Sequence, residues 1–410
     1  MTATPSTPLW RNRDFTLLWT GQVVSTVGTR VTSVAYPLLV LLLTGSPALA
    51  GAVAFVQTLP FLLLYLPGGA WVDRWDRRRT MVLCELGRAV ALGSVALTAV
   101  VAGVHAVGVG QLAVVAFAEG CLFVLFDLAE GAALPHLVPP EQVPAAVAYN
   151  QARTQGADLV GQPLGGILFT VSPVLPFAVD AASYLLSGGA VAAIRSRLQA
   201  ERAPGTERLR TRIAAGLRFV RHSAFLRETV VLVGLMNLVF NGLFLALIVR
   251  ARDLGASPAT VGLMLSTLGL GGLLGSLAAP AVHRRLPGRL ILVGVGWLWA
   301  VVQTALVLAP TPLWLGVLVF VTSLFGPVFN VVIGAYVYQL VPDELLARVR
   351  STSRLVAWGT IPVGSLLGGL LADVLGAGPA LLVFGLLMVP VAVATTLSPG
   401  MRQVGMPVPG

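Results

Sequence analysis

Long apolar runs separated by short polar connections make up most of this 410-residue chain. The hydrocarbon core of a bilayer is about 30 Å thick, and a helix rising about 1.5 Å per residue needs roughly 20 apolar residues to cross it. Twelve runs of this length occur, each bounded by glycine, proline or charge. We expect membrane-spanning helices at 15–43, 47–72, 80–103, 108–134, 145–170, 174–194, 226–249, 258–282, 288–309, 313–340, 349–373 and 377–397.

Composition and connection length exclude a water-soluble fold. Only 11% of the residues are charged and 56% are apolar, and most connections are too short for an extramembrane domain. A backbone in hydrocarbon must satisfy its own hydrogen bonds, which favours helices, and the alternating pattern of a membrane β-barrel is absent. The sequence therefore predicts an all-α membrane protein with twelve transmembrane helices, in contact with lipid around its circumference.

The distribution of arginine predicts the orientation of the chain. The net charge of +10 comes from arginine alone, since lysine is absent. If successive connections alternate between the two sides, 22 of the 27 arginines lie on the side of the two termini. The positive-inside rule then places both termini in the cytoplasm. Residue usage suggests a bacterial source, so we expect the bacterial inner membrane, and this placement of the arginines argues against a nucleic-acid partner.

The two halves of the chain are related by an internal repeat. A gapless shift of 203 residues aligns 138–168 with 341–371 and keeps proline, glutamate and glycine in register. We expect two pseudo-symmetric six-helix bundles, an N-terminal one at 1–194 and a C-terminal one at 226–410, joined by a basic cytoplasmic linker at 195–225. Apolar residues at helical spacing in the linker indicate an amphipathic helix along the membrane surface, with a disordered basic linker as the alternative. Two such halves can rock about a central cavity.

Ionisable residues within the apolar runs are candidates for function, because a charge in a membrane is costly unless it is paired or hydrated. Arg30, Glu119 and Asp158 lie near the centres of their runs, and Asp127 shares a helix face with Glu119 and Glu130, within about 80°. A carboxyl group that is partly removed from water can be protonated near neutral pH. We expect Glu119 to pair with Arg30 as the proton-coupling site, with Asp158 as a second proton site and Asp127 nearby; the alternative is a fixed ion pair that never titrates.

Polar stripes in both halves predict a shared substrate cavity. On run 145–170, Gln155 and Asp158 belong to one stripe, and on run 15–43, Gln22 and Thr26 belong to another. The second half supplies asparagines, Gln303 and aromatic side chains, a surface suited to large amphipathic solutes. The residues that we expect to line the cavity are Gln22, Thr26, Gln155, Asn237, Asn241, Asn330 and Trp358.

The segment 69–78, GAWVDRWDRR, resembles the G-x-x-x-D-R-x-x-R-R signature between the second and third helices of the major facilitator superfamily. The stretches GQVVSTVG (21–28) and LTGSPALAG (43–51) are most similar to its branch of enterobactin exporters and macrolide-efflux proteins. The resemblance implies a major facilitator fold and a cytoplasmic gate, in which Asp73 meets the eleventh helix near Arg348 and the arginines meet Glu130 or Asp127. The gate residues it implies are Gly69, Asp73, Arg74, Arg77, Arg78 and Glu130. Alternatively, these arginines serve topology alone.

The fifth run carries a second family-like motif. Gly161-Gln-Pro163-Leu-Gly165-Gly166 resembles the G-P-x-x-G-G signature of antiporters in the superfamily, with the proline one residue later than in that pattern. The resemblance implies proton antiport.

Together these features predict a secondary active transporter that exports drug- or siderophore-like amphipathic molecules by proton-coupled alternating access, as a monomer. A proton-coupled nutrient importer is the alternative with the same scaffold, and a non-transporting receptor is the alternative of another class. We expect no enzymatic activity, cofactor or metal, because the four histidines are scattered and no phosphate-binding loop occurs.

Overall fold

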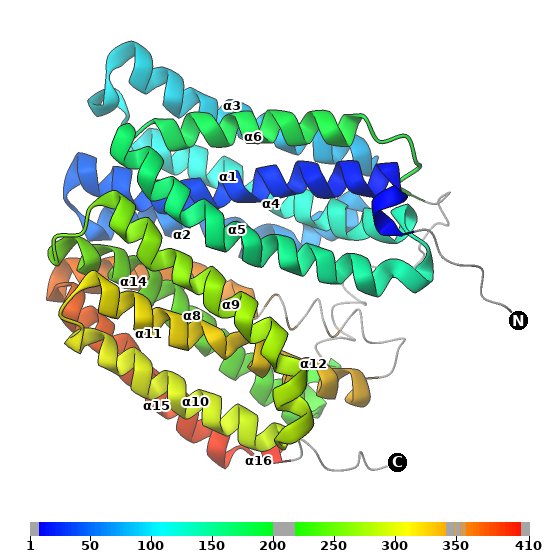
Figure 1. Ribbon diagram of the computed structural model, residues 1–410, viewed down its shortest axis with the longest axis vertical. Helices are drawn as coiled ribbons and strands as arrows, with labels where there is room; N and C mark the ends of the chain where they lie inside the picture. Colours follow the sequence, from blue (N-terminus) through cyan, green and yellow to red (C-terminus); the bar gives the residue numbers. More distant parts are fainter. Residues whose placement is uncertain are drawn as a thin grey trace, which may run out of the picture.

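The computed structural model describes residues 8–199, 218–341, 349, 353, 355 and 357–402, and every regular element in these ranges is a helix (Figure 1). The first half contains α1 (Arg13–Thr44), α2 (Pro47–Val72), α3 (Arg77–Ala102), α4 (Val109–Leu137), α5 (Val143–Val171) and α6 (Leu175–Ala192), with the short turns η1 (Leu9–Arg11), η2 (Val104–Ala106) and η3 (Pro140–Gln142). In this N-terminal group, α1 packs against α5 and α6, α3 against α4 and α6, and α2 against α4.

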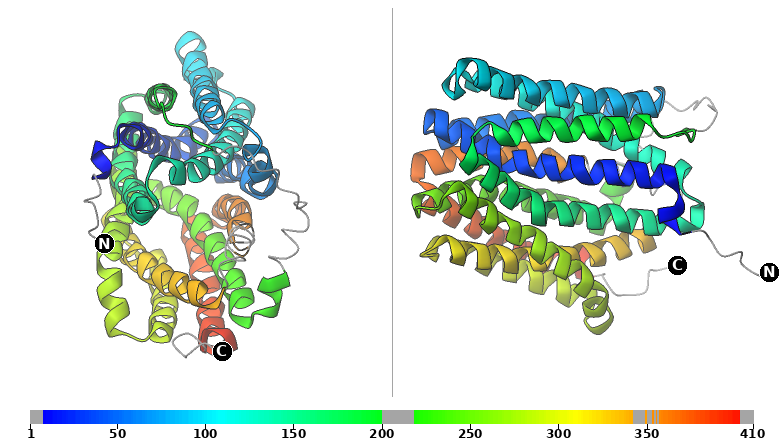
Figure 2. Two further views of the ribbon diagram at one scale, coloured as in Figure 1. Left: turned by 90° about the vertical axis from the view of Figure 1, so that its right-hand side faces the viewer. Right: turned by 45° about the horizontal axis from the view of Figure 1, so that its top comes forward.

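The second half forms a C-terminal group on the other side of the molecule. It contains α8 (Ala224–Asp253), α9 (Pro258–Arg285), α10 (Gly288–Ala305), η4 (Leu306–Leu308), α11 (Pro312–Leu324), α12 (Gly326–Leu340), α14 (Ile361–Leu375), α15 (Ala377–Leu397) and α16 (Pro399–Arg402). Helix α8 packs against α14 and α15, α10 against α15, and α9 against α11. The views in Figure 2 show these helices below those of the N-terminal group.

Local sequence signals explain where the helices begin and end. The side chains of Asn12, Ser46, Asp76, Ser223, Ser257 and Thr311 each accept a hydrogen bond from the first turn of the helix that follows. These residues replace intrahelical partners that the first backbone N–H groups lack. Gly45 ends α1 in the left-handed conformation, with φ 68°, which only glycine adopts without strain.

Eleven stretches in the described ranges are long and apolar enough to cross a membrane. The remaining expected span is α5, which has 29 residues but carries the polar stripe described above. Large apolar side chains such as Val90, Leu277 and Val374 are exposed on the outside of the bundle. These side chains would face lipid, where an apolar surface carries no cost.

The tenth span, expected over 313–340, is present as one membrane-length stretch, Pro312–Val337, with a single non-helical residue between its two helices. The chain turns at Phe325, between α11 and α12. Pro327 cannot donate a backbone hydrogen bond, and its ring crowds the carbonyl four residues earlier. Proline alone is not sufficient, since α1 continues through Pro37. The adjacent Gly326 supplies the second destabilising residue.

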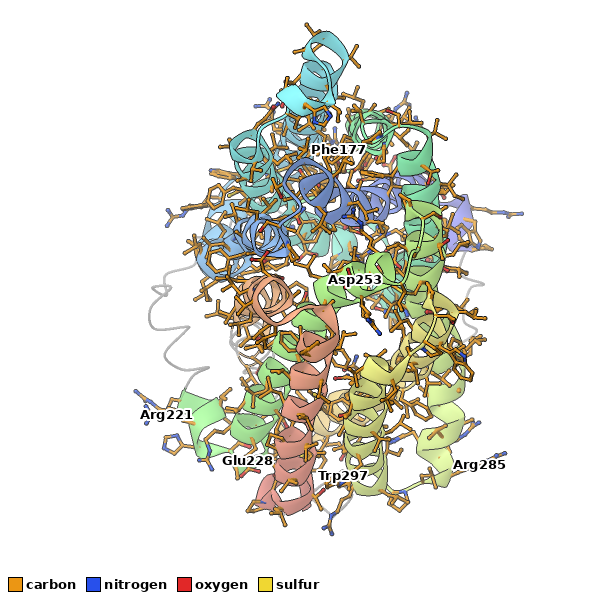
Figure 3. The ribbon with its side chains drawn as sticks, turned by 90° about the vertical axis from the view of Figure 1, so that its left-hand side faces the viewer. Phe177, Arg221, Glu228, Asp253, Arg285 and Trp297 are labelled. Carbon is orange, nitrogen blue, oxygen red and sulfur yellow. The ribbon has the colours of Figure 1, made fainter. Side chains whose placement is uncertain are left out.

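The start of α1 and the end of α15 lie at one end of the molecule, here called the termini end, and the opposite end is called the far end (Figure 1). The two groups meet where α5 packs on α9 and where α2 packs on α14. Figure 3 looks onto the far end, with Phe177 of α6 among the helices of the N-terminal group and Asp253 at the end of α8 near the middle. The division into units 1–194, 195–225 and 226–410 stays a prediction, and the amphipathic helix expected in the linker falls mostly outside the described residues.

Candidate functional site

A central cavity of about 610 Å³ lies between the two helix groups near the termini end. Tyr65 and Leu128 line it from the last turns of α2 and α4, and Leu226 lines it from the first turn of α8. Asn330 of α12 also lines it, as expected from the sequence. The cavity is mostly apolar with a few polar groups, which suits an amphipathic solute.

The far end is closed by close contacts between the groups. Gly51 of α2 packs directly on Gly369 of α14, so that a Cβ at position 51 would lie 2.8 Å from the Cα of Gly369. Asp373 of α14 accepts hydrogen bonds from the Ser46 hydroxyl at 3.0 Å and from the Ala48 backbone N–H at 3.3 Å. The two groups therefore leave a cavity between them near the termini end and are in close contact at the far end.

The antiporter-like motif lies within a second contact between the groups, where α5 packs on α9. A Cβ at Gly161 would lie 2.6 Å from the Cβ of Arg30, and a Cβ at Gly165 would lie 2.5 Å from the backbone oxygen of Val31, both on α1. Gly166 faces the Pro258 carbonyl of α9 with no space for a side chain, and Pro163 lies against Gly262 of the same helix. The motif therefore permits close packing of α5 between α1 and α9. Gln155 belongs to this contact, against Gly272 of α9, and lines neither cavity described here.

Aromatic side chains bridge the two groups beside the central cavity. The Trp358 ring lies 5.5 Å from the Tyr65 ring and 5.9 Å from the Phe61 ring of α2, measured between centroids. Phe61 in turn lies 5.7 Å from Phe123 of α4. The Tyr65 hydroxyl donates to Asp127 Oδ2 at 3.0 Å. Trp358 is therefore a contact between the groups at the edge of the cavity.

A second cavity, here called the side cavity, has a volume of about 420 Å³ and lies inside the C-terminal group between α8, α10, α11 and α12. Asn237 and Asn241 of α8 line it, as do Gln303 of α10 and Asn330 of α12. Asn330 and Val233 line both cavities, so the two spaces adjoin. The asparagines that the sequence marked for a substrate cavity thus line cavities, while their role in binding stays a prediction.

Four ionisable side chains form a buried charge cluster in the N-terminal group: Glu85 and Arg88 of α3, Glu119 of α4 and Asp180 of α6. Their exposed fractions are 0%, 3%, 3% and 0%, respectively. Burial this complete requires that each charge be paired or hydrogen-bonded, because water cannot compensate it.

Glu119 and Arg88 are the centre of this cluster. Arg88 Nη2 lies 3.7 Å from Glu119 Oε1, and the Tyr184 hydroxyl donates to the same oxygen at 2.9 Å. Tyr36 donates to the other oxygen at 3.2 Å. The Arg88 guanidinium carbon also lies 3.9 Å from the centroid of the Tyr184 ring, which stabilises the cation through the ring face.

Glu85 and Asp180 flank this pair. Glu85 Oε1 accepts hydrogen bonds from Gln22 at 2.9 Å and Ser187 at 2.8 Å, and its Oε2 lies 3.9 Å from Arg88. Asp180 accepts from Thr32 at 2.7 Å. The cluster therefore holds three carboxyl groups and one guanidinium, which contacts two of them, and a neutral cluster requires that two of the carboxyl groups hold protons.

The expected pairing of Arg30 with Glu119 is wrong. Arg30 Nε instead lies 2.8 Å from Asp158 Oδ1, and Gln162 donates to the same aspartate oxygen at 3.5 Å. The reason is the rotation of α1, which turns Arg30 toward α5 and its Thr29 hydroxyl toward Tyr184 of α6. The side chains of Arg30 and Asp158 are 34% and 18% exposed, so this pair is far more accessible than the buried charge cluster.

The same rotation corrects the expected place of Gln22 and Thr26. Gln22 is buried and its amide donates to Glu85 and Ser187, so it belongs to the buried charge cluster. Thr26 donates to the Gln22 carbonyl within α1. Neither residue lines a cavity described here.

The signature segment also differs from expectation at Glu130. Its carboxylate forms a two-pronged pair with Arg153 of α5, at 2.7 and 3.3 Å, instead of meeting the signature arginines. Arg77 donates to the carbonyls of Ala132 and Leu198.

Two further signature arginines and the signature aspartate lie at the same end. Arg78 donates to the Ser196 carbonyl at 2.6 Å, Gly69 lies in the last turn of α2, and Arg74 follows that helix. Asp73 is exposed at the C-terminus of α2. Its expected partner near Arg348 falls outside the described residues.

Sequence reasoning missed Glu85, Arg88 and the full burial of Asp180. The signal was present, because Glu85 and Arg88 are charged residues three positions apart inside the run 80–103. Arg30 and Glu119 were selected because they are charged residues within apolar runs, and Glu85 and Arg88 meet the same criterion.

Comparison with known proteins agrees with this geometry. Residues 3–403 match the family model of transmembrane secretion effectors within the major facilitator superfamily. The chain belongs to this family. Among the relatives of this transmembrane secretion effector is the multidrug efflux pump Tap of Mycolicibacterium fortuitum, 30% identical over 393 residues, which cover 92% of the chain and 93% of the relative. Another relative is macrolide efflux protein A of Streptococcus pyogenes, 23% identical over 404 residues and covering 96% and 98%.

Solved structures support the same fold. A bacterial homologue of the lysosomal transporter Spinster, in an inward-facing unoccupied conformation, matches with a TM-score of 0.75 at 14% identity, over 97% of this chain and 98% of that one. A bacterial homologue of ferroportin in an inward-facing state matches with a TM-score of 0.67 at 16% identity, over 94% and 100%. The expected fold class is confirmed: the secretion effector is an all-α, multi-pass membrane protein with the major facilitator fold, and it is an efflux transporter.

Proposed function

We propose that this secretion effector exports amphipathic organic compounds from the bacterial cytoplasm across the inner membrane in exchange for protons. The cavity and the opposite closure support alternating access, in which the two helix groups tilt about the central cavity. The names of the relatives, multidrug efflux pump and macrolide efflux protein, support a drug-like substrate. One chain is the transport unit, because it supplies both helix groups and both closing contacts.

The termini end faces the cytoplasm in this proposal. Arginine is concentrated at that end, as the positive-inside rule requires, and the signature arginines Arg77 and Arg78 bind backbone carbonyls there. The central cavity then opens inward and the Asp373 contact closes the outer side. The described conformation would be the one that takes up its substrate from the cytoplasm.

The observation that carries proton coupling is the charge imbalance of the buried charge cluster. Among the described residues, Glu85 and Glu119 contact one cation, Arg88, and the buried Asp180 accepts hydrogen bonds from Thr32 and Ser183. An uncompensated buried carboxylate costs several kcal/mol, so protons must bind when the cluster is closed to water. A transport cycle that opens the cluster alternately to each side would load and release these protons.

A chain of side chains connects this cluster with the contact between the helix groups. The Phe123 ring lies 5.7 Å from the Arg88 guanidinium carbon and 5.7 Å from Phe61, which contacts Trp358 of the other group. Protonation of Glu119 would weaken its attraction for Arg88 and let the guanidinium shift against Phe123. This gives proton binding a physical route to the rocking motion.

The Arg30–Asp158 pair is the second proton site in this proposal. It lies where α5 packs on both α1 and α9, since Gly161 adjoins Arg30 and Gly269 of α9 adjoins Asp158. Its exposure gives water access in the described conformation. Asp127 accepts a hydrogen bond from Tyr65 beside the cavity, and this bond would link it to the contact between Tyr65 and Trp358. The gate around Asp73, Arg74 and Glu130 would close the cytoplasmic side in the opposite state.

The test uses purified protein in liposomes with the fluorescent cation ethidium as substrate. Counterflow without any gradient would establish carrier activity, and a receptor would show none. An inward-acid pH gradient should drive ethidium into inside-out oriented vesicles in exchange for protons. Uptake that instead requires protons to move with ethidium would establish a symporter and overturn the export mechanism.

A further inference from the structure

Gln303 is a buried amide without a partner. It is 0% exposed, and neither its Nε2 nor its Oε1 has a hydrogen bond to any residue that the structure describes. Buried amides in native proteins are hydrogen-bonded almost without exception. Gln303 lines the side cavity, and a turn of its side chain would bring both amide atoms to a molecule in that cavity, which can supply both missing hydrogen bonds.

The wall around Gln303 is aromatic. The Trp299 ring packs edge-on against Phe240 at 5.1 Å and lies 5.2 Å from Phe329. Its indole N–H donates to the Thr322 carbonyl at 2.8 Å, just before the break between α11 and α12. Broken helices at membrane depth occur where the backbone lines a cavity, and they often build binding sites.

The electrostatics of the side cavity restrict its ligand. Every side chain that lines it is uncharged. A charged ligand group would be left without a counterion in an apolar space. A neutral aromatic ring can instead pack against the rings of Trp299, Phe240 and Phe329.

We propose that the side cavity is a binding subsite for neutral aromatic lactams and primary carboxamides. In these compounds the N–H and the C=O point the same way, and so they can pair with both the oxygen and the nitrogen of the Gln303 amide. The inference rests on the proposed export function and names one substrate class for it. Such a compound would pass from the central cavity along Asn330, which lines both spaces.

Two probes that differ by one group test the hydrogen bonds. Radiolabelled 2-quinolone is a neutral aromatic lactam, and 1-methyl-2-quinolone has the same rings without the N–H. Equilibrium binding to the purified protein in lipid nanodiscs should be saturable and about tenfold tighter for 2-quinolone, as expected for one buried hydrogen bond. Gln303→Leu should remove this preference, so that both probes bind alike.

Matched variants separate a binding role from a structural one. Gln111→Leu makes the same change on α4, where Gln111 donates to Ser94 and Thr98, and it should keep the wild-type preference. Val319→Phe fills the side cavity from α11 and should weaken the binding of both probes. This variant keeps the test valid if Gln303→Leu fails to fold. Absence of saturable binding by the wild type, or an unchanged preference in Gln303→Leu, overturns the proposal. If a pH gradient fails to drive ethidium uptake while 2-quinolone still binds more tightly than 1-methyl-2-quinolone, the result would count against the export mechanism alone.

Discussion

Arg88 and Glu119 lie 3.7 Å apart, Nη2 to Oε1, in a part of the N-terminal group that water does not reach. The Tyr184 hydroxyl contacts both, at 2.5 Å from Arg88 and 2.9 Å from Glu119. Glu85 and Asp180 are buried beside this pair, so that three carboxyl groups and one guanidinium lie in the same cluster.

Glu119→Gln should abolish ethidium uptake driven by a pH gradient while counterflow continues. The amide keeps hydrogen bonds to Tyr36 and Tyr184 but cannot bind and release a proton. Transport in proteoliposomes measures both activities. The exposed Glu141→Gln is the matched control and should behave like the wild type. Normal gradient-driven uptake by Glu119→Gln would remove this residue from coupling.

Arg88→Leu should lower the stability of the folded protein by about 3–5 kcal/mol, because the buried carboxyl groups lose their cation. Thermal unfolding in detergent measures this effect. Arg79→Leu, an exposed change on the same helix, should alter stability by less than about 1 kcal/mol. Adding Glu119→Gln to Arg88→Leu should restore part of the loss, and strictly additive effects would show that the two residues do not interact.

Gly166→Ala should hinder closure of the far end, since its methyl group would collide with the Pro258 carbonyl of α9. We expect transport to fall at least about tenfold, because backbone cannot move aside as a flexible side chain can. Gly156→Ala on the same helix meets nothing within 4 Å and should transport normally. Equal activity of the two variants would mean that α5 and α9 do not need this close approach.

Asp373→Asn should shift the protein toward the state that is open at the far end. The substitution removes the charge that holds the Ser46 hydroxyl and the Ala48 N–H across the two groups. Spin labels at Val171 and Leu308, in a background without Cys84 and Cys121, would report a longer far-end distance. Asp253→Asn changes an exposed aspartate at the same end and should leave that distance unaltered. A distance distribution identical to wild type in Asp373→Asn would rule out this contact as a latch.

The amino-acid sequence by itself determined the membrane class, the helix positions and the family. The length of an apolar run, which must match the thickness of the bilayer, can be read directly along the chain. Capping residues such as Ser46 and Ser257 act within a single helical turn, so they can be read in the same way. The signature around Asp73 and the polar stripes are likewise readable without coordinates. Even the break at Phe325 had a local cause, the Gly326–Pro327 pair.

Only the tertiary structure decided which charges meet. Helical periodicity gives the face of a helix but not the neighbour toward which that face is turned. The rotation of α1 alone sent Arg30 to Asp158 and Gln22 to Glu85, where the sequence favoured Glu119 and the substrate cavity. The unpaired amide of Gln303 is also a property of packing, because an unmet hydrogen bond exists only when every neighbour is in place. Pairing energies fall off within a few ångströms, so a rotation of one helix exchanges partners that the sequence cannot distinguish.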